Sequence, residues 1–157
     1  MAVSKEEFRA AMGRFASGVT VVTAKFGDGR PCGMTVSAFS SVSLEPPLIL
    51  VCIDKRASIH DSLKEGNHFA VNILADEQEV ISRRFASREE DRFSGVGYKD
   101  GTTGVPLLDG AIAYLECGVV HEYPGGDHTI VVGEVLHAQV TDGRPLAYFR
   151  GGYAQLA

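Results

Sequence analysis

The protein is 157 residues long, 45% hydrophobic and 22% charged, with a formal net charge of −5. This size and composition predict one globular domain that spans residues 1–157. The Lys and Arg residues are scattered among carboxylates, which argues against a nucleic-acid partner. No apolar run approaches the ~18 residues of a membrane span, and the N-terminus is typical of an amphipathic helix rather than a signal peptide. We therefore expect a cytoplasmic protein without membrane contact.

The chain has three cysteines, Cys32, Cys52 and Cys117, which are far apart and form no CxxC pair. This number and spacing predict neither a disulfide framework nor a zinc site. The histidines also lack the spacing of metal ligands. We expect reduced thiols and no metal.

In chain order, the N-terminal half begins with a helix and continues as strands. Ser4 and Glu7 have the spacing of a capping box, and apolar residues at helical intervals predict a helix that ends at Gly18. Stretches bounded by turn residues predict strands at 19–25, 34–43, 48–53 and 68–74. The run at 48–53 is continuously apolar, as in a strand covered on both faces. A short helix is expected at 58–64, ended by Gly66.

The C-terminal half predicts one helical region and then hairpins. A polar helical pattern covers 76–93 with a break near Ser87, and the glycine-rich stretch 94–110 is expected to be an exposed loop. Strands are predicted at 113–123, 129–140 and 146–150, the first two joined by a turn at 124–128. Antiparallel hairpins outnumber possible βαβ units. The predicted fold is therefore mainly β with flanking helices, an antiparallel barrel that is closed or partly closed.

Several common catalytic motifs are missing from the sequence. The nearest candidate for a dinucleotide-binding G-x-G-x-x-G, at Gly95 and Gly97, has Asp100 at the third glycine position and follows no predicted strand. The sequence contains no G-x-x-x-x-G-K-[ST] and no G-x-S-x-G. Nucleotide hydrolysis and acyl transfer therefore lack their usual sequence support.

Small and hydroxyl-bearing residues fill the segment 33–41, where a core strand is expected. Small side chains let a flat ligand approach the backbone, whose N–H groups can bond to the pyrimidine edge of a flavin, where negative charge collects on reduction. The alternative interpretation is a Ser/Thr-rich edge strand that is hydrogen-bonded to water.

Two further segments are candidates for ligand contact. Residues 54–58 follow an apolar strand and open a predicted helix, whose free amides, with Ser58 and Lys55, would suit a flavin phosphate. Asp54 and Ser58 as simple helix caps are an equally good interpretation. At 125–128, two glycines precede Asp127 and His128, which would let a nicotinamide come close to the imidazole. A structural role for that histidine is the alternative.

These three features, in this order and spacing, resemble the flavin reductase family of two-component monooxygenases, whose members adopt the FMN-binding split-barrel fold. The matching motifs are FASGVTVVT (15–23), GMTVSAFSSVSLEPP (33–47), FAVNIL (69–74), RFA (84–86), GDH (126–128) and FRGGY (149–153). Singly the motifs are weak, but together they span nearly the whole chain.

The resemblance implies a homodimer that reduces FMN or FAD by hydride transfer from NADH or NADPH and supplies reduced flavin to a partner monooxygenase. The flavin ring and ribityl chain would lie against Thr35, Val36, Ser37, Ala38, Phe39, Ser40 and Ser41. The phosphate side would be held by Asp54, Lys55, Ala57 and Ser58, with Phe85 nearby. Asp127, His128 and Tyr153 would lie at the open face where the nicotinamide enters, with His128 as the residue that acts in the reaction.

Hydride transfer asks little of the protein, because the flavin carries the redox chemistry and the two rings need only be stacked. This explains the lack of an acid–base or nucleophile set. Two alternatives stay open: a non-enzymatic FMN-binding electron carrier, and a split-barrel oxidase acting on a small substrate. The sequence does not choose between FMN and FAD or between NADH and NADPH.

Overall fold

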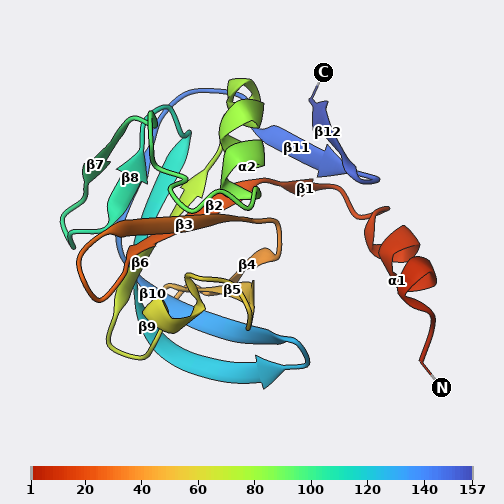
Figure 1. Ribbon diagram of the computed structural model, residues 1–157, viewed down its shortest axis with the longest axis horizontal. Coiled ribbons are helices and arrows are strands. Elements are labelled where there is room, and N and C mark those ends of the chain that lie inside the picture. The colour runs from red at the N-terminus through yellow and green to blue at the C-terminus, as the bar shows by residue number, and fades with distance from the viewer. Residues whose placement is uncertain (1, 157) are drawn as a thin grey trace.

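The computed structural model describes residues 2–156, and most of its regular structure is β-strand (Figure 1). Helix α1 (Lys5–Met12) comes first, with the predicted capping box: Ser4 Oγ accepts a hydrogen bond from the Glu7 amide at 3.1 Å, and the Glu7 carboxylate accepts one from the Ser4 amide at 3.3 Å. The predicted helix end at Gly18 was wrong. The helix ends at Gly13, because Ser17 and Gly18 form strand β1 (Ser17–Gly18) and pair with β11 (Leu146–Phe149).

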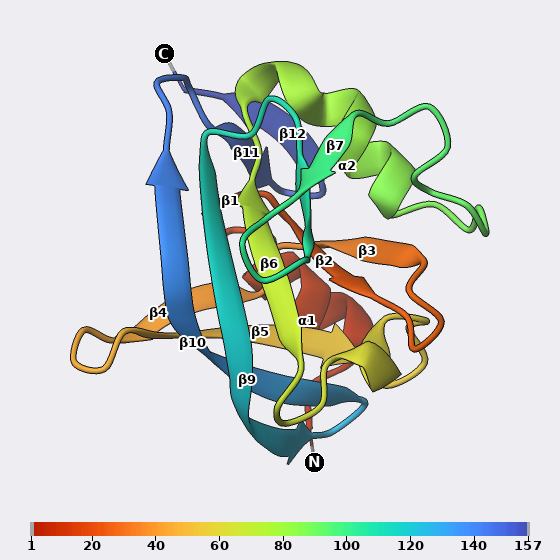
Figure 2. The ribbon, with the colours of Figure 1, turned by 90° about the vertical axis from the view of Figure 1, so that its left-hand side faces the viewer.

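Seven antiparallel strands form one curled sheet, which Figures 1 and 2 show from two sides. Their spatial order is β3 (Pro31–Val36), β2 (Thr20–Lys25), β6 (His68–Ile73), β9 (Ala113–Gly125), β10 (His128–Val140), β5 (Leu48–Asp54) and β4 (Phe39–Ser43). The long β9–β10 hairpin was predicted from two strand-like segments, 113–123 and 129–140, joined by a turn at 124–128, and it is confirmed. The predicted fold class, mainly β with flanking helices, is also confirmed.

Smaller elements lie around this sheet. β1, β11 and β12 (Gly152–Gln155) form a three-stranded sheet, and β7 (Tyr98–Asp100) pairs with β8 (Pro106–Leu108). Helix α2 (Glu79–Phe85) follows the 3-10 helix η2 (Asp76–Gln78), and a second 3-10 helix, η1 (His60–Ser62), follows β5. No helix within residues 2–156 is long and apolar enough to cross a membrane.

Both faces of strand β2, which lies next to the edge strand β3, are covered by apolar side chains. Val22 belongs to the main cluster, together with fully buried residues such as Val51 and Phe69. Its neighbour Val21 points to the other face and belongs to a second cluster that includes Phe85 of α2. This two-sided packing follows from the period-two alternation of a strand. It fixes α2 against the sheet beside β3.

Four other expectations for the elements were wrong, each because of packing between distant segments. The predicted strand 34–43 is broken at residues 37–38 into β3 and β4, and the predicted helix 58–64 is only the single 3-10 turn η1. The predicted loop 94–110 contains the β7–β8 hairpin, with β8 fully buried. In β5 every second residue is only half-buried, so the strand is not covered equally on both faces.

Candidate functional site

The free edge of the seven-stranded sheet at β3 is where the candidate site begins. β3 pairs only with β2, and α2 packs against it. A Cβ at Gly33 would lie 3.1 Å from the ring of Phe85, so the missing side chain lets the helix approach closely. Thr35 Oγ1 donates a hydrogen bond to the carbonyl of Ser82 at 2.6 Å. The small residues of this segment therefore join β3 to α2 as well as leaving the strand edge accessible.

One hollow, of about 200 Å³, lies where β3 and α2 meet the C-terminal strands; we call it the tyrosine pocket. Its lining includes Thr35, Ser37, Ser82, Ala86, Tyr148 and Tyr153. The Tyr153 hydroxyl is 2.7 Å from Ser82 Oγ, and the Arg83 guanidinium lies 4.8 Å from the centre of the Tyr153 ring. These contacts hold the tyrosine ring at the wall of the pocket, where it can contact a flat ligand.

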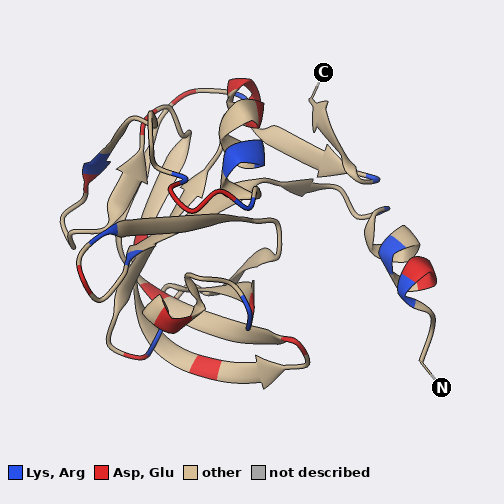
Figure 3. Cartoon of the chain, viewed as in Figure 1, with Lys and Arg blue, Asp and Glu red and all other residues tan. Residues whose placement is uncertain are grey.

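A larger hollow, of about 490 Å³, lies at the other end of β3; we call it the arginine groove. Gly33, Ala57, Ser58 and four arginines, Arg30, Arg56, Arg88 and Arg92, contribute to its lining. Arg92 is half-buried and donates to the carbonyls of Gly33 (2.8 Å) and Ser87 (2.6 Å). Burial lowers the pKa of its guanidinium below the usual value. Figure 3 shows basic and acidic residues dispersed over the chain, and the groove lining likewise combines the four arginines with Glu89 and Glu90.

The tip of the β9–β10 hairpin lies beside the segment that follows β5. His128 is the cross-strand partner of Asp54, and the Lys55 amide donates to the Asp127 carbonyl at 3.0 Å. Asp127 Oδ1 is 2.7 Å from His128 Nδ1, which fixes the orientation of the imidazole, and this hydrogen bond lowers the pKa of Asp127. The structure thus brings together two of the three segments that the sequence singled out.

Residues 35–41 lie along the end of β3, a short exposed turn and β4. Ser37 and Ala38 are exposed, so their backbone is accessible to a ligand. Val36 is buried and Phe39 packs against the same core cluster, so these two side chains belong to the core. Ser40 and Ser41 are exposed, and Ser40 Oγ donates to the Ser41 carbonyl at 2.9 Å.

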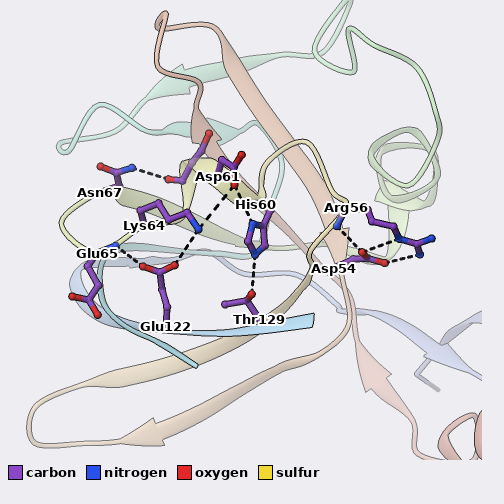
Figure 4. A network of polar contacts seen from close by, with 10 residues as sticks. Asp54, Arg56, His60, Asp61, Lys64, Glu65, Asn67, Glu122 and Thr129 are labelled. Carbon is purple, nitrogen blue, oxygen red and sulfur yellow. Dashed lines mark hydrogen bonds and ion pairs between the residues drawn. The ribbon is translucent and has the colours of Figure 1, made fainter. Parts of the chain in front are cut away.

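The phosphate argument from a helix N-terminus at 54–58 was wrong, because η1 has only three residues and begins at His60. Asp54 instead forms an ion pair with Arg56 at 3.0 Å, and hydrogen bonds from Arg56 hold its pKa at about 2 (Figure 4). Figure 4 also shows His60, whose Nε2 lies 2.8 Å from Thr129 Oγ1. Ala57 and Ser58 line the arginine groove, whereas Lys55 is exposed and is not part of its lining.

The remaining predicted residues are separated from one another. Phe85 is fully buried, with its ring 5.0 Å from that of Phe93, so in this structure it lies behind Gly33 rather than at the surface of either hollow. Tyr153 lines the tyrosine pocket, whereas His128 lines neither that pocket nor the arginine groove. Within residues 2–156 of one chain, these two nicotinamide candidates therefore do not share a hollow.

Six residues that line the two hollows were not predicted from the sequence: Ser82, Tyr148 and the four arginines. Ser82 lies three residues before Phe85, on the same face of α2, so the helical period could have found it. The arginines come from three separate segments, since Arg88 and Arg92 both lie in the loop between α2 and β7, and no sequence signal brings the three segments together.

The three cysteines are free thiols, as predicted. Burial raises the pKa of Cys32 to about 11 and that of Cys117 to about 12. Both thiols therefore stay protonated at neutral pH and are poor nucleophiles. The chemistry available at the β3 edge is ligand binding by hydroxyls, backbone amides, aromatic rings and guanidinium groups.

Comparison with known proteins agrees with this geometry. The family model described as "Flavin reductase like domain" matches residues 12–157. The reductase component of 4-nitrophenol 4-monooxygenase/4-nitrocatechol 2-monooxygenase from Rhodococcus opacus is 42% identical over 151 residues, covering 96% of this chain and 80% of that protein. FMN reductase (NADH) from Agrobacterium fabrum is 42% identical over 154 residues, covering 98% and 87%.

Among solved structures, the NADH:FAD oxidoreductase of Streptomyces globisporus in complex with NAD and FAD fragments superposes with a TM-score of 0.92. It is 39% identical, and the match covers 100% of this chain and 97% of that one. With a family match over nearly its whole length, this chain belongs to the flavin reductase like domain family.

Proposed function

We propose that this chain is an NAD(P)H-dependent flavin reductase that transfers a hydride to FMN or FAD and supplies reduced flavin to a partner monooxygenase. The observation that carries the proposal is the β3 edge, where small hydroxyl-bearing residues lie between a pocket lined by tyrosines and a groove lined by arginines. Relatives at 42% identity, an FMN reductase (NADH) and a monooxygenase reductase component, support both the reaction and the partner.

The residues present fit a flavin. A flavin has a flat ring system and an anionic phosphate, and the two hollows at opposite ends of β3 offer aromatic walls and guanidinium groups respectively. In the proposal, the backbone and hydroxyls of 35–41 hold the ring, and Ala57 and Ser58 hold the phosphate side. Bound flavin supplies the redox chemistry by accepting a hydride from the dihydronicotinamide.

In this proposal, the chain's own residues contribute by positioning the groups that hold the flavin and the nicotinamide. Ser82 accepts a hydrogen bond from Thr35 through its carbonyl and contacts the Tyr153 hydroxyl through its Oγ, so one residue orients both groups. Asp127 orients His128, which is proposed to hold the nicotinamide over the flavin. Holding two rings in reactive contact contributes to rate because it removes the entropy cost of aligning them.

A homodimer is part of the proposal. No residue of α1 is buried, and Phe8, Met12 and Phe15 in and after this helix are 56%, 55% and 80% exposed. Figure 1 shows α1 standing away from the seven-stranded sheet. An amphipathic helix without a partner in its own chain is suited to packing on a second copy. In a dimer, His128 of one chain and Tyr153 of the other could contribute to the same site.

Steady-state oxidation of NADH and NADPH with FMN, FAD or neither flavin tests the proposal. The expected result is oxidation that needs flavin and exceeds the rate without protein for at least one nicotinamide. A purified protein that keeps a bound flavin and does not oxidise either nicotinamide would instead be an electron carrier.

A further inference from the structure

The tip of the β9–β10 hairpin, which carries His128, extends beyond the strand that lies beside β9. β6 pairs with β9 only as far as Gly118, and residues 123–127 are exposed. On the other side of the hairpin, β5 reaches the tip, where its Asp54 is the cross-strand partner of His128. The position of the β9 arm therefore depends on contacts from segments outside the sheet.

The segment that follows β5 contacts both arms of the hairpin (Figure 4). On β10, Thr129 Oγ1 lies 2.8 Å from Nε2 of His60, which belongs to η1. On β9, Glu122 accepts a hydrogen bond from the Glu65 amide at 3.0 Å and forms an ion pair with Lys64 at 3.4 Å. We call these contacts of residues 60–65 with the two arms the hairpin clasp.

The contact between His60 and Thr129 is the enclosed part of the clasp. The side chain of His60 is 14% exposed, and Thr129 is 8% exposed. Asp61 Oδ1 lies 3.3 Å from Nδ1 of His60. An ionised carboxylate only accepts hydrogen bonds, so it favours the tautomer with a proton on Nδ1, and Nε2 then accepts from the Thr129 hydroxyl. This hydrogen bond is stronger than an exposed contact because little water competes for it.

A carboxylate, an imidazole and a hydroxyl in this order are also the groups of a hydrolytic triad. Thr129, however, is buried and has strand neighbours on both sides, Ile53 of β5 and Pro124 of β9. It lines neither the tyrosine pocket nor the arginine groove. A hydroxyl enclosed in this way is not placed to attack a substrate, so the arrangement is suited to positioning.

We propose that His60 is a positioning residue for the nicotinamide step and acts through Thr129 on His128. Thr129 directly follows His128 in β10, so fixing its side chain fixes the backbone that carries the imidazole. Asp127 then sets the orientation of the ring on that backbone. The inference rests on the proposed function, because it concerns the residue proposed to hold the nicotinamide.

Steady-state kinetics of Thr129→Val and Thr129→Ser test the proposal. Valine keeps the branched shape and removes the hydroxyl, whereas serine keeps the hydroxyl and is the matched control. Thr129→Val is expected to lower kcat/KM for the nicotinamide that the wild type oxidises by ~3- to 30-fold, because the imidazole is misplaced. Flavin affinity and the kinetics of Thr129→Ser should stay within ~2-fold of the wild type, since neither depends on the lost hydroxyl.

Double variants show whether the effect passes through the proposed residues. Combined with His128→Ala, Thr129→Val should cost less than ~2-fold more, because no imidazole is left to position. His60→Leu should match Thr129→Val, and the two together should be no worse than either alone, since both remove one hydrogen bond. An undiminished loss in the His128→Ala background, or additive losses at positions 60 and 129, would overturn the inference.

Hydrogen exchange of the amides at 125–128 gives a readout that needs neither flavin nor nicotinamide. Exchange is expected to be faster in Thr129→Val than in the wild type and Thr129→Ser, because the tip opens more often. Equal exchange in all three proteins, or equal kinetic losses in the valine and serine variants, would overturn the inference. Thermal unfolding checks that each variant is folded. If the wild type oxidised no nicotinamide, the proposed function would fail, and exchange would still decide whether His60 positions the tip.

Discussion

His128 lies at the first position of β10, where Asp127 orients its imidazole. Replacing it with alanine is expected to lower kcat/KM for NADH by ~10- to 100-fold, because positioning is lost and no proton transfer is required of this residue. Flavin affinity measured without NADH should change little. His121→Ala is the matched control, since His121 is an exposed histidine on the partner strand β9 that stacks on Tyr123.

The opposing interpretation is that His128 only pins the hairpin tip. In that case His128→Ala would lose thermal stability and flavin binding together. An unaltered kcat/KM in a folded variant would remove the residue from the nicotinamide site.

Ser58 is the hydroxyl-bearing residue of 54–58 that lines the arginine groove. Ser58→Ala is expected to weaken FMN by ~3- to 10-fold, since a hydrogen bond to a charged group contributes about 1.5–3 kcal/mol and exposure reduces this. Riboflavin, which has no phosphate, should bind nearly unchanged. Lys55→Ala provides the comparison, because Lys55 lies outside the groove. Equal loss for FMN and riboflavin would place the effect of Ser58 on the ring or on folding.

The β7–β8 hairpin is held to the sheet by a buried carboxylate on β9. Glu116 accepts hydrogen bonds from the Thr103 amide (2.8 Å), the Thr103 hydroxyl (2.7 Å) and the Thr102 amide (3.3 Å). Burial alone would raise its pKa, but these hydrogen bonds outweigh it, so the pKa lies below the ordinary value of 4.5. The negative charge of Glu116 therefore stabilises the folded state.

Because the folded pKa is lowered, this stabilisation is complete above the ordinary pKa and is lost as the pH falls through the folded value. Glu116→Gln is expected to lower the free energy of unfolding at pH 7 by about 1–3 kcal/mol, a fall in Tm of roughly 3–10 °C. The Tm difference between wild type and variant should shrink below about pH 4. Glu77→Gln, at an exposed carboxylate on η2, is the control. A Tm difference independent of pH would contradict the assignment.

Among the helices and strands, the sequence correctly predicted the features that depend on a few neighbouring residues. The capping box of α1 and the β9–β10 hairpin are confirmed, because a cap and a hairpin turn are defined by a few neighbouring residues. The β7–β8 hairpin was missed, because it is held by Glu116, which lies beyond it in the chain. The candidate site was predicted only in part for the same reason: segments 33–41 and 54–58 have local signals, whereas Arg30, Arg56, Arg88 and Arg92 meet only after folding.

At the scale of the whole molecule, the exposed apolar residues of α1 predict a homodimer. Sedimentation should give about twice the chain mass of 16.8 kDa. The double substitution Phe8→Asp with Met12→Asp is expected to give a folded monomer that binds flavin more weakly, because a charge on each residue opposes burial in an interface. Val80→Asp, at a 76% exposed apolar residue on α2, is the control. A monomeric wild-type protein that binds flavin tightly would refute the dimer.

We propose that the β3 edge holds a flavin for repeated reduction by a nicotinamide, and anaerobic mixing of protein, flavin and nicotinamide measures this reduction. Catalytic protein is mixed with excess FMN or FAD and excess NADH or NADPH, and the loss of oxidised-flavin absorbance is followed. Many equivalents of flavin per chain should be bleached with at least one nicotinamide, well above the rate without protein. Bleaching that stops at one equivalent per chain, or that does not exceed the rate without protein for any pair, would contradict it.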